Sequence, residues 1–478
     1  MFLSSFRNVA RRPMVRAARP TLELLEDRTL LSNSPIGDVF VILMENHNWT
    51  QPSSAPAGTP PQIQGNPSAP YINNTLTQIG AFANNYESTG VHPSEPNYIW
   101  LEAGSNLGVT DDNDPTDPAN RFNVPSFTQQ LDNAGISWKS YQEDIDLDSN
   151  GRLLPRRQWT VPLSSTSGTR SDGTQWNYAP KHNPDVFFDY NIGATAANGF
   201  TPNPNDRFGI AHNQPLQQFY KDLLTGKVGR FNYITPDQYN DMHSLRNGST
   251  DLIAQGDNWL AQNIPIIMAS KEYKNNGVIM VVWDETEGGD TSDFTIPFFL
   301  ISPLAKAGYS NNDLYSHSST LKTLEEIEGV GPFLGGAGNP GVNDLSNLFQ
   351  PGVLTPSTLK GTVYIDLQDL GSFQKGDPGV SGLTVQLTGT NEAGEAVNLS
   401  TTTSFNGSYS FTGLLPGVYN ITIGHVSGLR NDFTTPTGAR DDITLGVDQT
   451  ISGLDFGLVH GHHHHHQAEH GESAGHDQ

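Results

Sequence analysis

The 478-residue chain is long enough for two or three domains, and its 26 Lys and Arg against 50 Asp and Glu give a formal net charge of −24. This charge argues against a nucleic-acid backbone as a partner, whereas an excess of carboxylates suits the binding of cations. The chain has no cysteine, which excludes disulfides, thiolate metal sites and thiol catalysis.

The first 34 residues differ in charge from the rest of the chain. They hold six arginines against three acidic residues and lack the apolar stretch of an ordinary signal peptide. Residues 22–32, LELLEDRTLLS, resemble an N-terminal sorting motif of large bacterial surface and secreted proteins. We interpret residues 1–34 as a targeting segment; a disordered basic arm is the alternative.

Two short apolar runs predict buried parallel strands, at residues 38–44 (DVFVILM) and 277–283 (GVIMVVW). Further strands are predicted at 136–141, 231–234 and 296–302, and helices at 71–85, 124–134 and 320–327. Strands separated by helical segments predict an α/β fold with a mostly parallel sheet flanked by helices. Glu45 and Asn46 follow the first apolar run and Asp284 and Glu285 follow the second, where open α/β sheets bind ligands.

The stretch 91–106 (VHPSEPNYIWLEAGSN) joins a His-Pro-Ser turn to an apolar, helix-compatible run. Pro96 fits the first turn of a helix, so Ser94 lies where helix amides would face an incoming anion. A hydroxyl nucleophile that attacks phosphate would suit this place. The alternative is that Ser94 only caps the helix.

Other polar segments lie farther along the chain. Residues 111–117 (DDNDPTD) form an acidic loop, interpreted as solvated in preference to calcium-binding because it lacks the spacing of an EF-hand. Lys181 and His182 place a cation beside a titratable ring, and Asp241 and His243 follow the strand at 231–234. Carboxylate, amide and imidazole groups suit a hard or borderline divalent cation, and such a cation beside a serine suits phosphoryl transfer.

Six of these segments, in this order, resemble a known family: ENHNW, HPSEPNY, YAPKHNP, ITPDQYNDMH, VVWDE and YSHSS. They are similar to the phosphoesterase family that contains bacterial acid phosphatases and phospholipases C, within the alkaline phosphatase superfamily. The resemblance spans about residues 38–331 and is strongest to the acid phosphatase branch.

The resemblance implies a role for each matching residue. It implies that Ser94 is a nucleophile that is transiently phosphorylated, oriented by His92, and that Lys181 and His182 contact the phosphate or protonate the leaving group. The implied metal ligands are Glu45, Asn46, Ser94, Asp284 and Glu285, with Asp241, His243 and His317 as a second cation or proton-handling cluster. Glu285 stands where the wider superfamily often has His, so the number and identity of the metal ions stay open.

Beyond a linker at 348–358 the pattern becomes one of alternating strands with Gly, Asn and Pro turns, which predicts a small β-sandwich at 359–459. Its segments GTVYID, NGSYSF and LLPGVY resemble the B-type prealbumin-like repeats of bacterial surface adhesins. That resemblance implies calcium at Asp366, Asp369 and Asp377, although Gln368 replaces a usual Asp or Asn. The plain alternative is a structural spacer that holds the enzyme away from a surface.

The predicted organisation is a targeting segment (1–34), a catalytic domain (35–347), a linker (348–358), a β-sandwich (359–459) and a His-rich tail (460–478). The predicted function is a secreted or surface-attached phosphomonoesterase that uses a divalent metal ion and a phosphoserine intermediate. A phospholipase C-type phosphodiesterase and a surface adhesin on an inactive scaffold are the alternatives. The predicted partner is a phosphate-ester substrate, with surface attachment through the C-terminal domain.

Overall fold

The computed structural model describes residues 36–460, except 149, 155–164, 204–205, 288–293, 340, 352, 355–356, 369, 375, 392–395, 415–416, 427, 432–438 and 447–448. The predicted targeting segment, the tail beyond residue 460 and Asp369 therefore lie outside the described residues.

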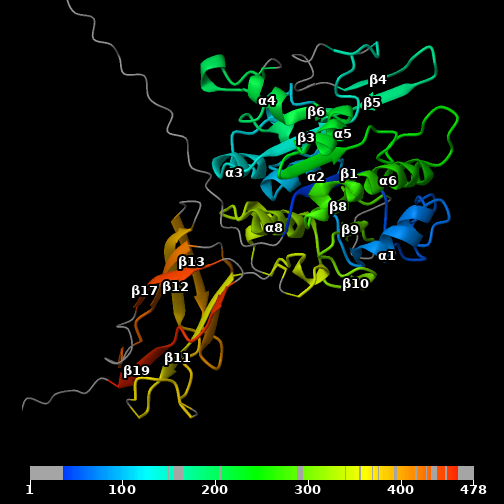
Figure 1. Ribbon diagram of the computed structural model, residues 1–478. Helices are drawn as coiled ribbons and strands as arrows, with labels where there is room; N and C mark the ends of the chain where they lie inside the picture. Colours follow the sequence, from blue (N-terminus) through cyan, green and yellow to red (C-terminus); the bar gives the residue numbers. More distant parts are fainter. Residues whose placement is uncertain are drawn as a thin grey trace, which may run out of the picture. The chain divides into compact units, whose positions relative to one another are not determined.

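The α/β part is built on one eight-stranded sheet in the order β10-β2-β9-β8-β1-β7-β3-β6 (Figure 1). Its strands are β1 (Val39–Met44), β2 (Ala81–Ala83), β3 (Trp138–Gln142), β6 (Asn213–Pro215), β7 (Phe231–Thr235), β8 (Val278–Trp283), β9 (Phe298–Ile301) and β10 (Tyr309–Asn311). Strand β1 pairs in parallel with both β7 and β8, whereas β9 runs antiparallel to β8 and β2. The prediction of a mostly parallel sheet is confirmed.

The helices are α1 (Thr77–Ile79), α2 (Glu95–Ala103), α3 (Phe127–Asn133), α4 (Arg207–His212), α5 (Leu216–Thr225), α6 (Leu252–Ala269), α7 (Lys271–Lys274) and α8 (His317–Glu328). A π-helical turn spans Ile72–Leu76, and the hairpin β4 (Thr166–Thr169) and β5 (Gln175–Tyr178) lies outside the main sheet. The helix predicted at 71–85 is too long. It ends at Ile79 because Gly80 is extended and the next residues pair with β9.

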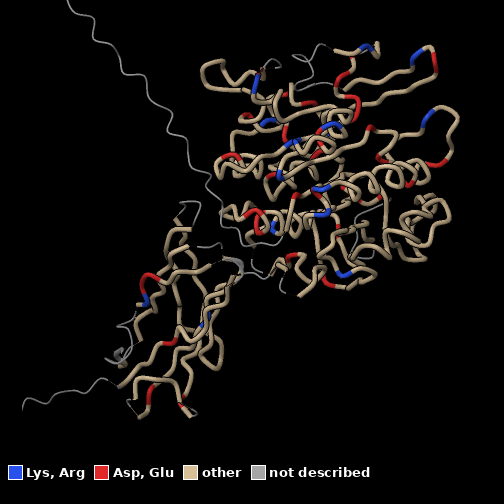
Figure 2. The backbone as a smooth tube through the Cα atoms, viewed as in Figure 1, with Lys and Arg blue, Asp and Glu red and all other residues tan. Residues whose placement is uncertain are grey.

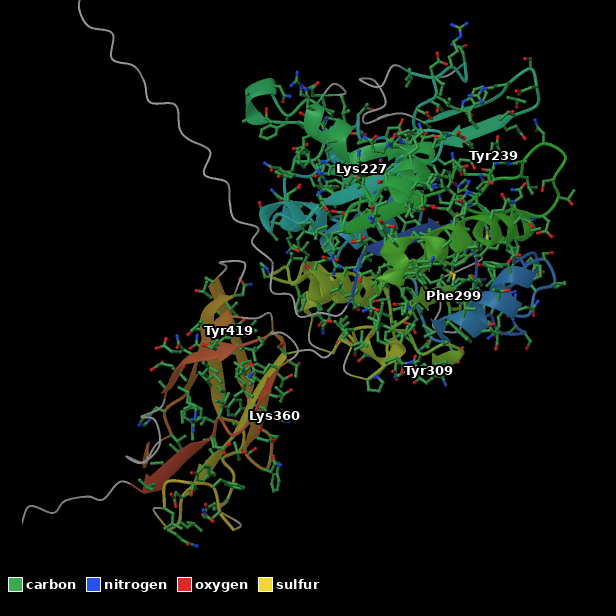
Figure 3. The ribbon with its side chains drawn as sticks, viewed as in Figure 1. Lys227, Tyr239, Phe299, Tyr309, Lys360 and Tyr419 are labelled. Carbon is green, nitrogen blue, oxygen red and sulfur yellow. The ribbon has the colours of Figure 1, made fainter. Side chains whose placement is uncertain are left out.

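Strand β1 is buried along its whole length because helices cover both faces of the sheet. Phe40 packs edge-on against Phe219 of α5 on one face, and Phe231 of β7 packs against Phe127 of α3 on the other. Fully burying each apolar side chain of such a strand contributes about 1.5–3 kcal/mol relative to exposure. On β9, Phe299 (labelled in Figure 3) packs against Trp49 and Phe82.

The parallel strands bring their carboxyl ends to one edge of the sheet, and backbone hydrogen bonds continue past the strands. The Asp284 N–H donates to the carbonyl of Met44 at 3.0 Å, and the Glu45 N–H donates to the carbonyl of Asp241 at 2.8 Å. These bonds fix the first residue after β1 beside the segment that follows β7, and the first residue after β8 beside the end of β1.

The C-terminal part consists of two sheets that enclose a separate apolar core. One sheet holds β14 (Ser408–Leu414), β11 (Ser357–Ile365), β19 (Phe456–His460), β16 (Leu429–Asn431) and β18 (Thr450–Ile451), and the other holds β13 (Ala396–Thr402), β12 (Thr384–Asn391), β15 (Gly417–Ile423) and β17 (Ala439–Leu445). Tyr419 is fully buried in this core, as are Val363 and Leu387. The predicted β-rich C-terminal region is confirmed.

Acidic residues recur in both parts of the chain, as the red segments of Figure 2 show. None of the helices in the described part of the chain is both long and apolar enough to cross a membrane.

Glu102 of α2 is a buried carboxyl group that joins two helices. Its Oε2 accepts hydrogen bonds from the Thr128 N–H at 3.1 Å and the Thr128 hydroxyl at 2.7 Å, in the first turn of α3. Burial raises the pKa of Glu102 to about 8, although the Thr128 hydrogen bonds favour the ionised form. The folded chain therefore keeps a proton on Glu102 at pH values where the unfolded chain has lost it.

This proton predicts that the free energy of unfolding falls as the pH rises. The unfolded carboxyl titrates near pH 4.3, so between about pH 4.3 and 8 this one group lowers the stability by about 1.4 kcal/mol per pH unit. Glu102→Gln, which keeps an acceptor oxygen but cannot ionise, should flatten the dependence measured by urea unfolding at pH 5 to 8. Asp172→Asn is the control, because hydrogen bonds to Thr174 lower the pKa of this exposed Asp. Equal slopes for wild type and Glu102→Gln would contradict the prediction.

Candidate active site

Ser94 lies at the N-cap of α2, but its side chain makes no capping hydrogen bond. Its Oγ instead lies 2.9 Å from Oε2 of Glu45 and 3.2 Å from Oε1 of Glu285, and it is buried. A hydroxyl has one proton, so the two carboxylates compete for it. The structure thus places the Ser94 hydroxyl between two strand ends, where it does not serve as a helix cap.

Asn46 connects the ends of β1 and β8. Its N–H donates to Oδ1 of Asp284 at 2.8 Å, and its side-chain amide donates to Oε1 of Glu285 at 2.6 Å. The φ of Asn46 is 33°, in the left-handed region that Asn tolerates better than most residues. The other carboxylate oxygen of Glu285 pairs with Nδ1 of His92, whose side chain is partly exposed.

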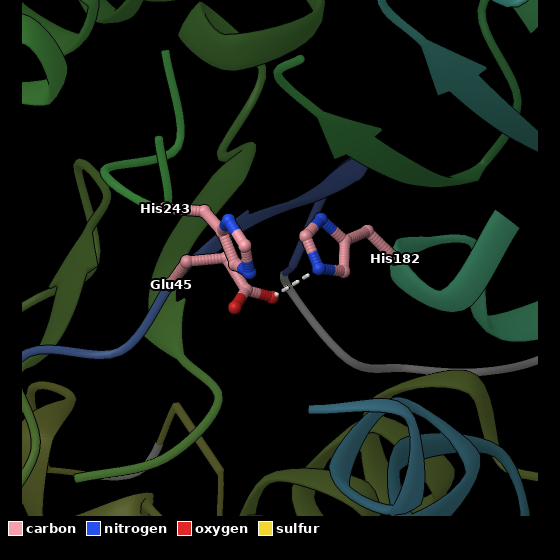
Figure 4. A group of neighbouring side chains, drawn as sticks. All are labelled: Glu45, His182 and His243. Carbon is pink, nitrogen blue, oxygen red and sulfur yellow. Dashed lines mark ion pairs between the residues drawn. The ribbon is translucent and has the colours of Figure 1, made fainter. Parts of the chain in front are cut away.

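On its other side, Glu45 lies beside two imidazole side chains, those of His182 and His243 (Figure 4). His182 Nε2 lies 3.0 Å from Oε1 of Glu45, and His182 Nδ1 lies 3.0 Å from Oδ2 of Asp241. The ligand atoms of Glu45, His182 and His243 all lie within 4.8 Å of one another. The Asp241 carboxylate also accepts the His243 N–H at 2.8 Å. These contacts connect the segments after β1, after β5 and after β7.

Burial and mutual repulsion dominate the electrostatics of this site. Burial and the Asp284 charge raise the pKa of both Glu45 and Asp241 well above the usual range, and burial with the Glu285 charge raises the pKa of Asp284 to about 8. Burial, aided by the Lys181 charge, lowers the pKa of His182 well below its ordinary value and that of His243 to about 4. The chain by itself thus opposes the anionic form of its own carboxylates.

The same arrangement fits a divalent cation. Carboxylate, amide and imidazole atoms converge without any thiolate, which is the donor set of a hard or borderline metal ion. Oδ2 of Asp284 is buried and has no hydrogen-bond partner among the described residues. Glu45, Asn46, Asp284 and Glu285 would hold such an ion beside Ser94, and His182 and His243 lie on the other side of Glu45.

Two predicted residues occupy less direct positions. His317, the first residue of α8, has Nε2 2.6 Å from the backbone carbonyl of Asp284 and Nδ1 3.2 Å from the Tyr86 hydroxyl. It would have to leave one of these contacts to bind a metal ion. Lys181 lies at the rim, where its ammonium donates to Oδ2 of Asp112 at 2.8 Å and lies 3.3 Å from Nε2 of His243. The metal-ligand and catalytic roles of all these residues stay predictions.

Tyr98 and Asp112 are two further residues of the site that the sequence patterns did not predict. The Tyr98 hydroxyl donates to Oε1 of Glu45 at 2.6 Å, and its ring stacks on His182 with centroids 5.1 Å apart. Tyr98 is part of the HPSEPNY segment, one helical turn after Ser94, so its place on the same helix face was a usable signal. Asp112 carried no such signal, because it belongs to a loop interpreted as solvated.

In the C-terminal domain, Asp366 and Asp377 lie in one loop. Asp366 accepts the N–H groups of Gln368 and Gly371, and Asp377 accepts those of Leu367 and Gln374. Both carboxylates therefore already organise the backbone of the loop. Calcium binding by Asp366, Asp369 and Asp377 stays a prediction, with Asp369 outside the described residues.

Comparison with known proteins matches both parts of the chain to family models. The model described as "Phosphoesterase family" matches residues 45–331, and the model described as "SdrD B-like domain" matches residues 357–458.

Named relatives match the first of these regions. A phosphatidylinositol-3-phosphatase of Mycobacterium tuberculosis is 32% identical over 284 residues, which cover 59% of this chain and 77% of that protein. A phosphate-repressible acid phosphatase of Penicillium chrysogenum is 26% identical over 266 residues, which cover 54% of each protein, so the match spans about half the length of this fungal relative. Among solved structures, a phosphonate monoester hydrolase of Agrobacterium radiobacter has 12% identity and a TM-score of 0.37, with 80% of this chain and 88% of that chain covered. A TM-score this low supports no argument.

The donor set predicts that a divalent cation stabilises the protein. After removal of metal with EDTA, adding Mn²⁺ should raise the melting temperature by several degrees, because an ion that binds only the folded state stabilises it in proportion to the logarithm of its concentration. Asp284→Asn should weaken the response to Mn²⁺, because an amide cannot supply the negative charge that a carboxylate ligand gives to a bound cation. Asp117→Asn, a change of equal charge in the loop at 111–117, should respond as wild type does. A wild type without any response to Mn²⁺, Mg²⁺, Ca²⁺ or Zn²⁺ would contradict the metal site.

Proposed function

The chain belongs to the phosphoesterase family and is a hydrolase acting on phosphate esters, and we propose that it is a metal-dependent phosphomonoesterase with Ser94 as its nucleophile. The observation that carries this proposal is the position of the Ser94 hydroxyl between Glu45 and Glu285, away from the capping position of its own helix. A serine at a helix start is common, but one held against two buried carboxylates is unusual.

In the proposed reaction, Ser94 Oγ attacks phosphorus while one of the two carboxylates accepts its proton. The bond from phosphorus to the ester oxygen breaks, and the leaving alcohol receives a proton at the rim, where Lys181 and His243 lie 3.3 Å apart. Water then attacks the phosphoserine, and Ser94 Oγ leaves and regains its proton. A divalent cation, when bound, supplies positive charge that neutralises the transferring phosphoryl group.

Other side chains position these groups. Asn46 fixes Asp284 and Glu285 through two hydrogen bonds, and Tyr98 fixes both Glu45 and the His182 ring. His92 pairs with Glu285 and so orients the carboxylate that faces Ser94. Because these hydrogen bonds already hold the carboxylates in place, the side chains need to reorganise less when charge develops in the transition state.

A phospholipase C-type diesterase is the second enzymatic candidate, since the same nucleophile and cation would serve a diester. The names of the relatives favour a monoester: both are phosphatases, and one is named for a phosphorylated inositol lipid. An adhesin on an inactive scaffold is disfavoured, because the acidic and imidazole groups remain assembled in one buried site.

We further propose that the catalytic domain spans residues 35–347 and is presented at or outside the cell surface by the domain at 359–459, joined by the linker at 348–358. The SdrD B-like match supports a surface location. The segment at 1–34 would then direct export.

The nucleophile proposal predicts opposite effects for two serines at helix starts. Ser94→Ala should lower kcat/KM on p-nitrophenyl phosphate by at least about 10³-fold with little change in melting temperature, because it removes the attacking atom but no cap. Ser126 does cap its helix, because its Oγ accepts the Gln129 N–H at 3.2 Å. Ser126→Ala should therefore lower the free energy of unfolding by about 1 kcal/mol and leave kcat unchanged. EDTA should abolish wild-type activity. Full activity of Ser94→Ala would disprove the mechanism.

The substrate class is decided by comparing three esters. We expect higher kcat/KM for p-nitrophenyl phosphate and for phosphatidylinositol 3-phosphate in vesicles than for phosphatidylcholine in matched vesicles. Because both lipids are presented in matched vesicles and only phosphatidylinositol 3-phosphate carries a phosphomonoester, comparing them distinguishes a preference for monoesters from a preference for lipids. Faster release of phosphocholine from phosphatidylcholine would favour the diesterase, and no turnover of any ester with any metal would favour the adhesin.

A further inference from the structure

Asp112 is the one residue of the acidic loop 111–117 that contacts a predicted catalytic side chain in the described part of the chain. Its Oδ2 accepts the Lys181 ammonium at 2.8 Å, and its Oδ1 accepts the N–H of Glu95 at 3.1 Å. The two contacts join the peptide that follows Ser94 to the short helix that carries Lys181 and His182.

The contact with Glu95 places a fixed anion at the start of α2. The N–H groups of the first helical turn lack intrahelical partners and attract negative charge. The Asp112 carboxylate already takes the first of these groups, so a phosphate at Ser94 does not receive this N–H. Apart from the divalent cation of the proposed reaction, positive charge for a phosphate at this site can come from Lys181, whose ammonium lies 3.3 Å from Nε2 of His243.

The contact with Lys181 limits where that cation lies. A lysine has a flexible four-carbon stem, so its ammonium is a poor catalytic group unless something restrains it. Asp112 restrains it at a point 3.3 Å from Nε2 of His243, and the side chain of Lys181 is only 14% exposed. His243 in turn lies beside Glu45. Asp112 and Lys181 thus adjoin the group of Glu45, His182 and His243, whose ligand atoms lie within 4.8 Å of one another.

We propose that Asp112 is a positioning residue: it holds the Lys181 ammonium at the phosphate side of the site, and it fixes the start of α2, which carries Ser94. This inference rests on the proposed function, and it assigns a purpose to a loop whose acidity suggested only solvation or calcium. The chemistry that Asp112 supports is recognition of a phosphoryl group through a restrained ammonium group.

The test uses inorganic phosphate as the probe, because its binding can be measured by calorimetry without turnover. Asp112→Asn keeps an oxygen for the Glu95 N–H but loses the charge that holds Lys181. It should weaken phosphate binding about tenfold and lower kcat on p-nitrophenyl phosphate by a similar factor, with an unchanged melting temperature. Asp117→Asn is the matched control in the same loop, and should bind phosphate as wild type does.

A double-mutant cycle shows whether Asp112 acts through Lys181. If it does, Lys181→Met weakens phosphate binding at least tenfold in wild type, but by less than twofold in the Asp112→Asn background. Independent, additive losses would overturn the inference, as would unchanged or tighter phosphate binding by Asp112→Asn. Coupling in phosphate binding with no turnover by wild type would support the inference and refute only the proposed reaction. A wild type that turns over p-nitrophenyl phosphate but does not bind phosphate would overturn the inference alone, and a wild type that does neither would overturn both.

Discussion

The structure depends on one electrostatic constraint, the burial of several carboxylates at the carboxyl ends of β1, β7 and β8. Glu45, Asp241, Asp284 and Glu285 are nearly or fully inaccessible to solvent, and repulsion among them adds to the cost of burial. Buried charges persist in proteins when they are paired, hydrogen-bonded or bound to a metal ion. Here Asn46, Tyr98 and the imidazoles supply part of this compensation, and a divalent cation would supply the rest.

The sheet makes this concentration of charge possible. Strand β1 is buried on both faces and pairs in parallel on both sides, so its end cannot move without breaking the pairing with β7 and β8. Hydrogen bonds beyond the strands then hold Glu45 to the segment of Asp241, and Asp284 to Met44. The burial of apolar side chains in the sheet thus offsets the cost of the buried carboxylates, which would be unfavourable in isolation. Functional sites often contain such locally unfavourable arrangements.

Ser94 and Lys181 reach this edge from two segments outside the sheet. The turn before α2 directs the Ser94 hydroxyl at two strand ends, while the short helix at Pro180–His182 brings a cation and an imidazole to the other side of Glu45. Asp112 connects these two segments at the rim. The site is therefore assembled from several separate stretches of chain. This explains why a lone Asp-Glu or Glu-Asn pair is weak evidence, whereas the longer motifs in their order are specific.

The sequence by itself determined the α/β sheet, the β-rich C-terminal region and the family, because continuous apolar runs, alternating strands and ordered polar motifs are local features. It also indicated Glu45, Asn46, Asp284 and Glu285, since polar residues after parallel strands must share one edge of the sheet. Only the tertiary structure decided that the Ser94 hydroxyl does not cap its helix, that His317 contacts a backbone carbonyl and that Lys181 donates a hydrogen bond to Asp112. These are contacts between segments 33 to 191 residues apart. Their geometry follows from how the helices pack on the sheet, and local sequence patterns carry no record of that packing.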